Sequence, residues 1–176
     1  SDKPAPNASN ATGSESAQRN ANGALTEEVI YLVMVDKLNL REEPSKSAKV
    51  IAQFPEGALV TGQGEISANK EQVTLRGMIY NEGYAKVKGY SASGAAGWAY
   101  NGALQKIYVG QAATRPDTAQ LTAFNTFLRS LDSKQIGSGK KLWDYLAEHA
   151  PQGSLADAFY VLSERFLKRM ELEGAY

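Results

Sequence analysis

The spacing of hydrophobic residues changes once along this chain, near residue 115. Before that point, apolar and polar residues alternate in short runs, which is the period of β-strands. After it, apolar residues recur every three or four positions, which is the period of amphipathic helices. The pattern therefore predicts an α+β protein, with a β-rich part over residues 27–110 and a helical part over residues 111–176.

The run from Val29 to Val35 is the most apolar stretch and does not alternate. Its odd-numbered residues are apolar, and so are its even-numbered residues. Two apolar faces predict a strand that is covered on both sides. A small β-barrel has only one interior, so we expect the helical part to cover the outer face of this strand.

Further short strands are bounded by turn residues. Leu38 and Leu40 fall on the same face of a strand that ends before Pro44, which cannot donate to a ladder. Pro55-Glu56-Gly57 is a turn in which proline sets φ and glycine supplies a left-handed position. The other expected strands are one within Gln72–Tyr80, Tyr84–Val87, Gly97–Tyr100 and Lys106–Val109.

These segments together resemble the bacterial SH3-like (SH3b) domain. The usual form of that domain has an L-N-V-R-x-x-P-S segment, an apolar strand, a G-x-x-V strand and a closing G-W-V-x-x-x-x-L. The matching positions are Leu38, Asn39, Leu40, Arg41, Pro44, Ser45, Val50, Gly57, Val60, Gly97, Trp98 and Leu104. The resemblance covers about Val29 to Gly110 and implies a small SH3-like β-barrel with Trp98 in its core.

The middle of the chain departs from the SH3b pattern. Family members have W-x-K-V soon after the G-x-x-V strand, whereas here an insertion from Glu65 to Gly83 comes first. Tyr84-Ala85-Lys86-Val87 then stands where the tryptophan pattern would be. Asn81-Glu82-Gly83 is expected to form a turn, and the Gly- and Ser-rich segment Lys88–Ala96 a mobile loop.

Three amphipathic helices are predicted after residue 115. Asp117 is placed to cap the first and Ser154, with Asp157, the third, while the second stops before Pro151. Their apolar stripes are Leu121, Phe124, Leu128 and Leu131; Leu142, Trp143 and Leu146; and Leu155, Phe159, Leu162, Phe166 and Met170. The fold class expected for the whole chain is thus a small SH3-like barrel with an insertion, followed by a three-helix unit.

The charge balance argues against some partners. The 176 residues carry 19 basic and 19 acidic side chains, and residues 1–26, 27–110 and 111–176 are each balanced by themselves. A chain without a field of one sign is a poor candidate for binding nucleic acid or an anionic membrane surface. The absence of cysteine excludes disulfides and thiolate chemistry.

Residues 1–26 are rich in Ser, Asn, Ala and Gly and are expected to form a flexible tether. A polar leash before a folded domain is typical of bacterial lipoproteins, in which an acylated cysteine precedes the leash. We therefore expect an exported protein of the bacterial cell envelope. Its contact with a membrane would be made only through a lipid anchor that precedes Ser1.

The sequence offers weak candidates for catalysis. His149 is the only histidine and is expected at the end of the second helix, where it has a structural role. Gly137–Lys141 resembles a phosphate-binding loop but lacks its first glycine and its Ser/Thr, and is expected to connect two helices. Asp144 and Glu148 share a helix face and are expected to be solvated.

The tyrosines of the β-rich part are candidates for ligand recognition, because tyrosine combines an apolar ring with a polar tip. We expect a groove between the insertion and the Lys88–Ala96 loop. Its wall would be formed by tyrosines, with asparagines supplying hydrogen bonds. The candidate ligand-binding residues are Asn81, Tyr84, Tyr90, Tyr100 and Asn101.

The sequence thus predicts a non-enzymatic, envelope-exposed module that binds a cell-wall peptide or glycan, or an envelope protein. It predicts no catalytic residue, no metal site and no cofactor. Two other classes stay open: a glycan hydrolase that uses carboxylates, and a structural subunit that docks through its helical face.

Overall fold

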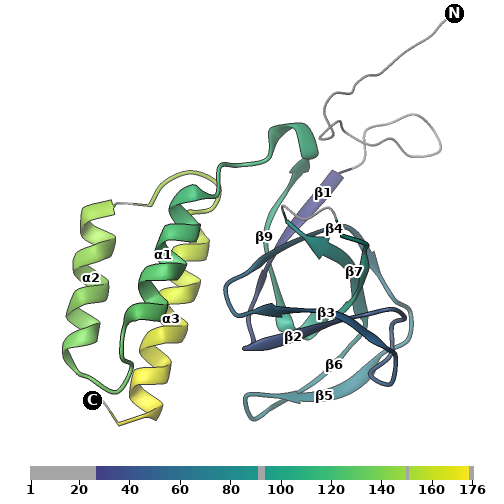
Figure 1. The fold of residues 1–176 in the computed structure, drawn as a ribbon, viewed down its shortest axis with the longest axis horizontal. Coiled ribbons are helices and arrows are strands. Elements are labelled where there is room, and N and C mark those ends of the chain that lie inside the picture. The colour runs from purple at the N-terminus through teal and green to yellow at the C-terminus, as the bar shows by residue number, and fades with distance from the viewer. Residues whose placement is uncertain (1–26, 91–93, 150, 175–176) are drawn as a thin grey trace, which may run out of the picture. The chain divides into compact units, whose positions relative to one another are not determined.

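The protein is an α+β structure with a mostly antiparallel sheet followed by three helices (Figure 1). The computed structural model describes residues 27–90, 94–149 and 151–174; the expected tether, residues 1–26, lies outside them. The elements of the sheet region are β1 (Glu27–Val33), β2 (Lys37–Arg41), β3 (Val50–Pro55), β4 (Leu59–Ile66), β5 (Glu71–Leu75), β6 (Met78–Glu82), β7 (Tyr84–Gly89), β8 (Gly97–Tyr100), the 3-10 turn η2 (Asn101–Ala103), β9 (Leu104–Gln111) and the 3-10 turn η3 (Ala112–Thr114). The helices are α1 (Ala119–Ser130), α2 (Gly137–His149) and α3 (Ala156–Leu172).

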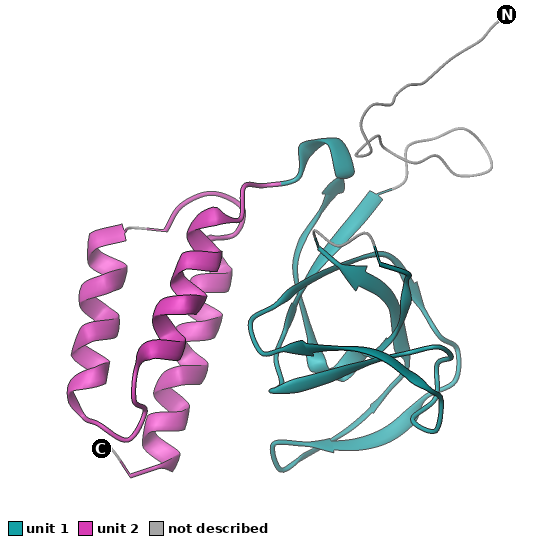
Figure 2. Cartoon of the chain, viewed as in Figure 1, with its two compact units in different colours: residues 1–115 teal, residues 116–176 magenta. Residues whose placement is uncertain are grey.

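The chain divides into two compact units between Arg115 and Pro116 (Figure 2). We call them the sheet unit and the helical unit. The boundary that the sequence suggested, Gly110, lies inside β9. Residues beyond β9 belong to the sheet unit because Arg115 forms a two-point ion pair with Glu28 of β1, through Nε–Oε1 and Nη2–Oε2 contacts of 2.7 Å each.

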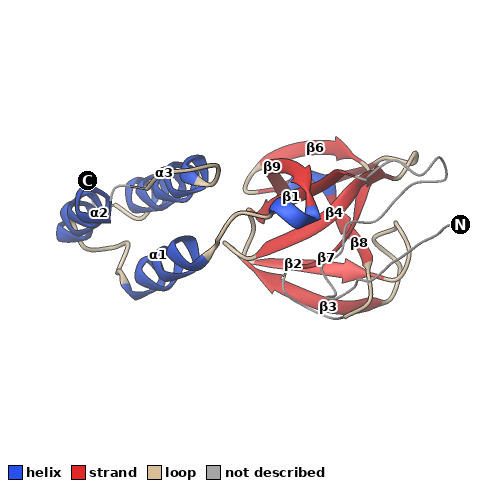
Figure 3. Ribbon diagram, turned by 90° about the horizontal axis from the view of Figure 1, so that it is seen from above, coloured by secondary structure: helices blue, strands red, loops and turns tan. Residues whose placement is uncertain are grey.

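Seven strands form one strongly curved antiparallel sheet in the order β3-β2-β8-β7-β4-β1-β9 (Figure 3). Within the described residues no ladder joins β3 to β9, so the sheet is not a closed barrel. Strands β5 and β6 form a separate two-stranded hairpin, which occupies the segment read from the sequence as an insertion.

The inner face of the sheet follows the alternation of apolar and polar residues. Its core consists of Val29, Tyr31, Val33, Leu38, Leu40, Val60, Ala85, Val87, Ala99 and Ala103. Ile30 and Leu32, on the other face of β1, are also fully buried, which confirms the prediction of a strand covered on both sides. That the helices provide this cover stays a prediction.

Gly57 and Gly97 of the sheet unit are required for different reasons. Gly57 has a φ of 89° and donates its N–H to Val33 O at 2.8 Å, as the turn predicted at Pro55–Gly57 requires. A Cβ on Gly97 would lie 2.7 Å from Leu40 Cγ and 2.8 Å from Arg41 O, because β8 approaches β2 closely at the core.

The hairpin turn was missed in the sequence, where a single strand was expected within Gln72–Tyr80. Arg76 and Gly77 have φ values of 52° and 79°, as a two-residue turn of the I′ type requires. The expected turn at Asn81–Gly83 is instead mostly strand, since Asn81 of β6 pairs with Gln72 of β5. Gly77 marks this turn in the sequence, but Arg76 obscures it, because an arginine in the left-handed region is uncommon.

The helical unit buries the stripes that the 3.6-residue period predicted. Phe124 of α1 is fully buried and stacks on Phe159 of α3, with ring centroids 4.9 Å apart. It also packs on Tyr145 of α2, with a centroid distance of 5.5 Å. Trp143 is an exception: it is 53% exposed, because it lies about 100° around α2 from Leu142, at the edge of the buried stripe.

Three local predictions in the helical unit need correction. The N-cap of α1 is Thr118, although Asp117 Oδ1 accepts the Ala119 N–H at 3.0 Å. Ser154 does not cap α3, whose N-cap is Leu155 and has no side-chain capping bond. Gly137–Lys141 does not connect two helices but forms the first turns of α2. That start is fixed by buried Ser138, whose Oγ donates to Asp132 O at 2.7 Å.

We predict that Gly97→Ala lowers the free energy of unfolding by about 1–3 kcal/mol, because the added methyl group overpacks the contact with Leu40 and Arg41. The measurement is equilibrium unfolding in urea. Gly94→Ala is the matched control, since nothing lies within 4 Å of a Cβ there. Equal stability of the two variants would contradict the close approach of β8 to β2.

Candidate ligand-binding face

The candidate site is the outer face of β7 and β8. Residues opposite each other in this antiparallel pair share a face, and the register pairs Tyr84 with Tyr100 and Lys86 with Trp98. Ala85, Val87 and Ala99 point to the core from the other face. The outer face of these two strands therefore carries two neighbouring cross-strand pairs: Tyr84 with Tyr100, and Lys86 with Trp98.

Tyr84 and Tyr100, both predicted as groove residues, are brought together but are buried, with exposed fractions of 2% and 7%. Their rings meet edge to face, with centroids 5.4 Å apart and planes at 77°. This is a favourable arrangement of two aromatic quadrupoles. The burial favours a packing role for both rings, while binding of a ligand by them stays a prediction.

Glu71, at the start of β5, accepts hydrogen bonds from both tyrosines. The Tyr84 hydroxyl donates to its Oε1 at 2.8 Å, and the Tyr100 hydroxyl donates to its carbonyl oxygen at 2.6 Å. The Tyr100 hydroxyl in turn accepts the backbone N–H of Glu82 at 2.9 Å. Both strands of the hairpin are thus tied to the outer face of β7 and β8.

The surroundings raise the pKa of both phenols. Burial raises the pKa of Tyr84 most, and its hydrogen bond to the Glu71 carboxylate raises it further. Burial also raises the pKa of Tyr100, and the hydrogen bond from the Glu82 N–H partly opposes the shift. Both hydroxyls therefore stay protonated as donors well into the alkaline range.

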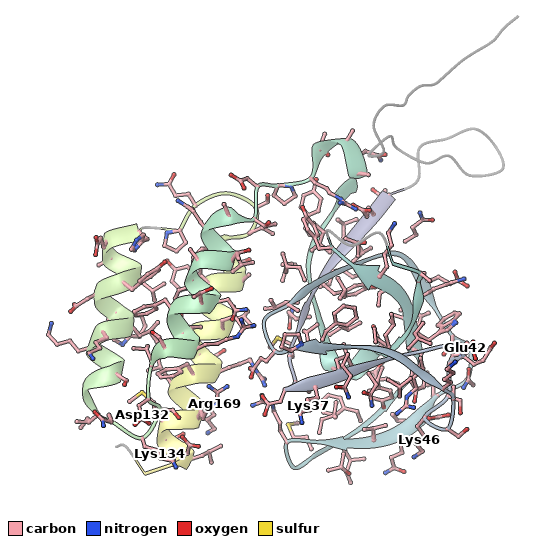
Figure 4. All side chains as sticks on the ribbon, viewed as in Figure 1. Lys37, Glu42, Lys46, Asp132, Lys134 and Arg169 are labelled. Atoms are coloured by element: carbon pink, nitrogen blue, oxygen red, sulfur yellow. The ribbon has the colours of Figure 1, made fainter. Side chains whose placement is uncertain are left out.

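The hairpin is also held at two further places. In the loop between β2 and β3, Lys46 (labelled in Figure 4) donates its N–H to Glu71 Oε1 at 3.1 Å and its ammonium to Gln72 O at 3.3 Å. At the hairpin turn, Arg76 forms an ion pair of 3.2 Å with Glu56. The segment is therefore a docked part of the sheet unit.

Trp98 is not in the core, contrary to the position implied by the SH3b resemblance. It is partly exposed, because the close approach of β8 to β2 leaves room only for Gly97 and Ala99 on the inner face. The Lys86 ammonium lies 5.8 Å from the centre of its ring. On the other side, Trp98 pairs with Arg41 of β2, whose Nη1 donates to Ala48 O at 2.8 Å.

Tyr90 does not join this site. It follows the far end of β7, six residues after Tyr84, which corresponds to about 20 Å along a strand. There its ring faces the Arg115 guanidinium at 4.8 Å, and its carbonyl accepts from Arg115 Nη1 at 3.2 Å.

The insertion and the Lys88–Ala96 loop, between which a groove was expected, start from opposite ends of β7. A groove between them stays a prediction. The hairpin joins one end of β7. Lys88 and Gly89, expected in the loop, are the last residues of this strand at its other end, and Tyr90 follows them. Residues 91–93 of that loop lie outside the described residues.

The two predicted asparagines flank the hairpin base. Asn81 of β6 is exposed. Asn101 of η2 donates its backbone N–H to Gly83 O at 2.9 Å, and its Nδ2 is 3.4 Å from Glu82 Oε1. Asn101 thus helps to position the hairpin, and Asn81 is available at the surface.

The weaker chemical candidates lie in the helical unit. Asp144 forms an exposed ion pair with Lys140 at 2.7 Å, and Glu148 is exposed, as expected for a solvated face. His149 ends α2, where its ring stacks on Tyr145 and its Nδ1 lies 3.0 Å from Tyr145 O. Within the described ranges, no group of three or more His, Cys, Asp or Glu side chains is placed to hold a metal ion.

Comparisons of the chain with protein-family models, with curated proteins and with solved structures found no match. In the part of the chain that the structure describes, no helix has the length and apolar character needed to cross a bilayer.

We predict that Tyr84→Phe lowers the free energy of unfolding near pH 7 by about 1–3 kcal/mol, because a hydrogen bond to a carboxylate is lost. The raised pKa of Tyr84 contributes stability that is complete below about pH 10, the unfolded value, and is lost as the pH rises through the folded value. Wild-type stability should therefore fall more steeply above about pH 10 than that of Tyr84→Phe.

Thermal melts across that pH range measure the difference between the two proteins. Tyr160→Phe is the control, because this tyrosine is half exposed on α3. Parallel pH profiles for wild type and Tyr84→Phe would contradict the role of the Tyr84–Glu71 contact.

Proposed function

We propose that this chain is an SH3b-like binding module of the bacterial cell envelope that acts without catalysis. Its ligand is a cell-wall peptide or glycan, or an envelope protein. The site is the outer face of the sheet at Trp98. The observation that carries the proposal is that this tryptophan is partly exposed on β8, a strand that is paired with β2 on one side and with β7 on the other.

The SH3-like part of the proposal is supported by what the matched residues do. Leu38, Leu40 and Val60 belong to the core of a strongly curved antiparallel sheet. Gly57 occupies the left-handed turn position, and Gly97 allows two strands to approach closely. The sequence pattern therefore coincides with positions at which these residue types are physically required.

The binding role is supported by the composition and rigidity of the face. Tryptophan and arginine are the residues most enriched among those that dominate binding energy. Trp98 lies between Arg41 on β2 and Lys86 on β7, so backbone ladders fix the spacing of all three. A preformed face of this kind loses little conformational entropy when it binds.

We predict that Trp98→Ala weakens retention on purified cell-wall sacculi by about thirtyfold, corresponding to about 2 kcal/mol for loss of a central aromatic contact. Co-sedimentation measures the retention, and circular dichroism checks the fold. A parallel binding assay with extracted envelope proteins covers the other ligand class.

Trp143→Ala is the matched control, because it removes the second tryptophan of the chain from an exposed helix position. If Trp98→Ala is folded and binds as before, the proposed face is wrong. If only Trp143→Ala loses binding, the helical unit is the docking surface. Release of soluble sugar from the sacculi by the wild-type protein would favour the glycan hydrolase instead.

A further inference from the structure

We infer that the row formed by Arg41, Trp98 and Lys86 recognises acidic side chains of a peptide segment. The inference rests on the proposed binding function of this face and adds the chemical class of the ligand. The three residues come from β2, β8 and β7, and consecutive members lie opposite each other in the ladders.

The ladder register places a basic residue on each strand that neighbours Trp98. Residues directly opposite in antiparallel strands have Cβ atoms about 4.5–5.5 Å apart. A ligand resting on Trp98 would therefore lie between the side chains of Lys86 and Arg41. The Arg41 guanidinium is held at Ala48 O and is near enough to Tyr84 to oppose the rise of its pKa. The Lys86 ammonium is already directed to the ring, at 5.8 Å from its centroid.

The hydrogen-bond donors of this row are not paired with carboxylates of the described residues. Among the described residues neither Arg41 nor Lys86 forms an ion pair. Arg41 uses Nη1 to donate to Ala48 O, which fixes the guanidinium and leaves its other N–H groups as donors. The indole N–H of Trp98 likewise has no acceptor among the described residues.

The carboxylate of Glu71 in the hairpin has partners outside the row. Glu71 Oε1 accepts from the Tyr84 hydroxyl and from the Lys46 N–H, so two neutral donors hold it. Neither cation of the row forms an ion pair with Glu71, so both can still meet a further carboxylate, although the charge of Arg41 already acts on the Tyr84 phenol. A ligand could supply that carboxylate, with the two-point geometry that a guanidinium favours.

The small extent of the row favours a peptide over a polyanion. Two cations beside one aromatic ring fit one or two carboxylates with an apolar stem stacked on the indole. A nucleic acid would require cations along an extended track, whereas the charges of residues 27–110 balance. We propose that the carboxylates recognised are those of acidic side chains. A peptide also carries a C-terminal carboxylate, so the probe has a blocked C-terminus.

The probe is an N-acetylated, C-amidated hexaglutamate peptide, titrated against the full chain carrying Trp143→Phe. That substitution leaves Trp98 as the only tryptophan, so the change in fluorescence reports this site. We expect a saturable change with hexaglutamate, and affinities at least about tenfold weaker for the matching hexaglutamine and hexalysine peptides. Raising the salt from about 50 mM to about 500 mM should weaken the hexaglutamate interaction.

Variants of Lys86 test whether the row itself provides the charge. Lys86→Gln should weaken hexaglutamate binding about threefold, and Lys86→Glu about tenfold. Lys106→Gln is the control, because it removes an exposed lysine from β9 with the same change in net charge. If the Lys86 and Lys106 variants lose the same affinity for hexaglutamate, the peptide responds only to the net charge of the protein, and the inference is wrong.

The outcomes separate this inference from the function on which it rests. If Trp98→Ala abolishes retention on sacculi but hexaglutamate does not bind, or hexaglutamine binds equally well, the acidic ligand class is wrong and the binding face stands. If Trp98→Ala also leaves retention unchanged, both are wrong. If sacculus retention and hexaglutamate binding both depend on Trp98, and hexaglutamate binding also depends on Lys86, the proposed function and the acidic ligand class are both supported.

Discussion

The arrangement of the candidate face depends on the contacts of Glu71 with Tyr84 and Tyr100. One residue at the start of β5 accepts both phenolic hydroxyls, through its carboxylate and its carbonyl oxygen. A buried phenol without a partner would cost free energy, so the two strands and the hairpin stabilise one another. This contact turns a segment that looks like an inserted loop into part of the sheet unit.

The same contact decides which aromatic residues of this face remain accessible to solvent. The hairpin covers the Tyr84–Tyr100 end of the outer face, whereas the Lys86–Trp98 end of the same two strands remains accessible. Burial and hydrogen bonding make the first pair a structural support. The partly exposed indole, with Arg41 and Lys86 on the neighbouring strands, is the part of the face that we propose as the binding surface.

Local patterns predicted much of the fold but misplaced the candidate site. The doubly apolar β1, the turn at Gly57 and the helical stripe through Phe124 follow from residue spacing alone, and all three are observed. Alternation in β8 also placed Trp98 and Tyr100 on one face. Sequence reasoning nevertheless assigned Trp98 to the core and Tyr100 to the surface. Consistent use of the period of two would have excluded that combination.

By itself, the sequence determined the class of each segment, because hydrophobic period and turn chemistry act over a few neighbouring residues. The tertiary structure decided which face of β8 is inward, since that depends on the space between β8 and Leu40 of β2. It also decided the partners of Glu71 and the separation of Tyr90 from Tyr84. These relations join residues that are distant along the chain, and no local pattern encodes such distances.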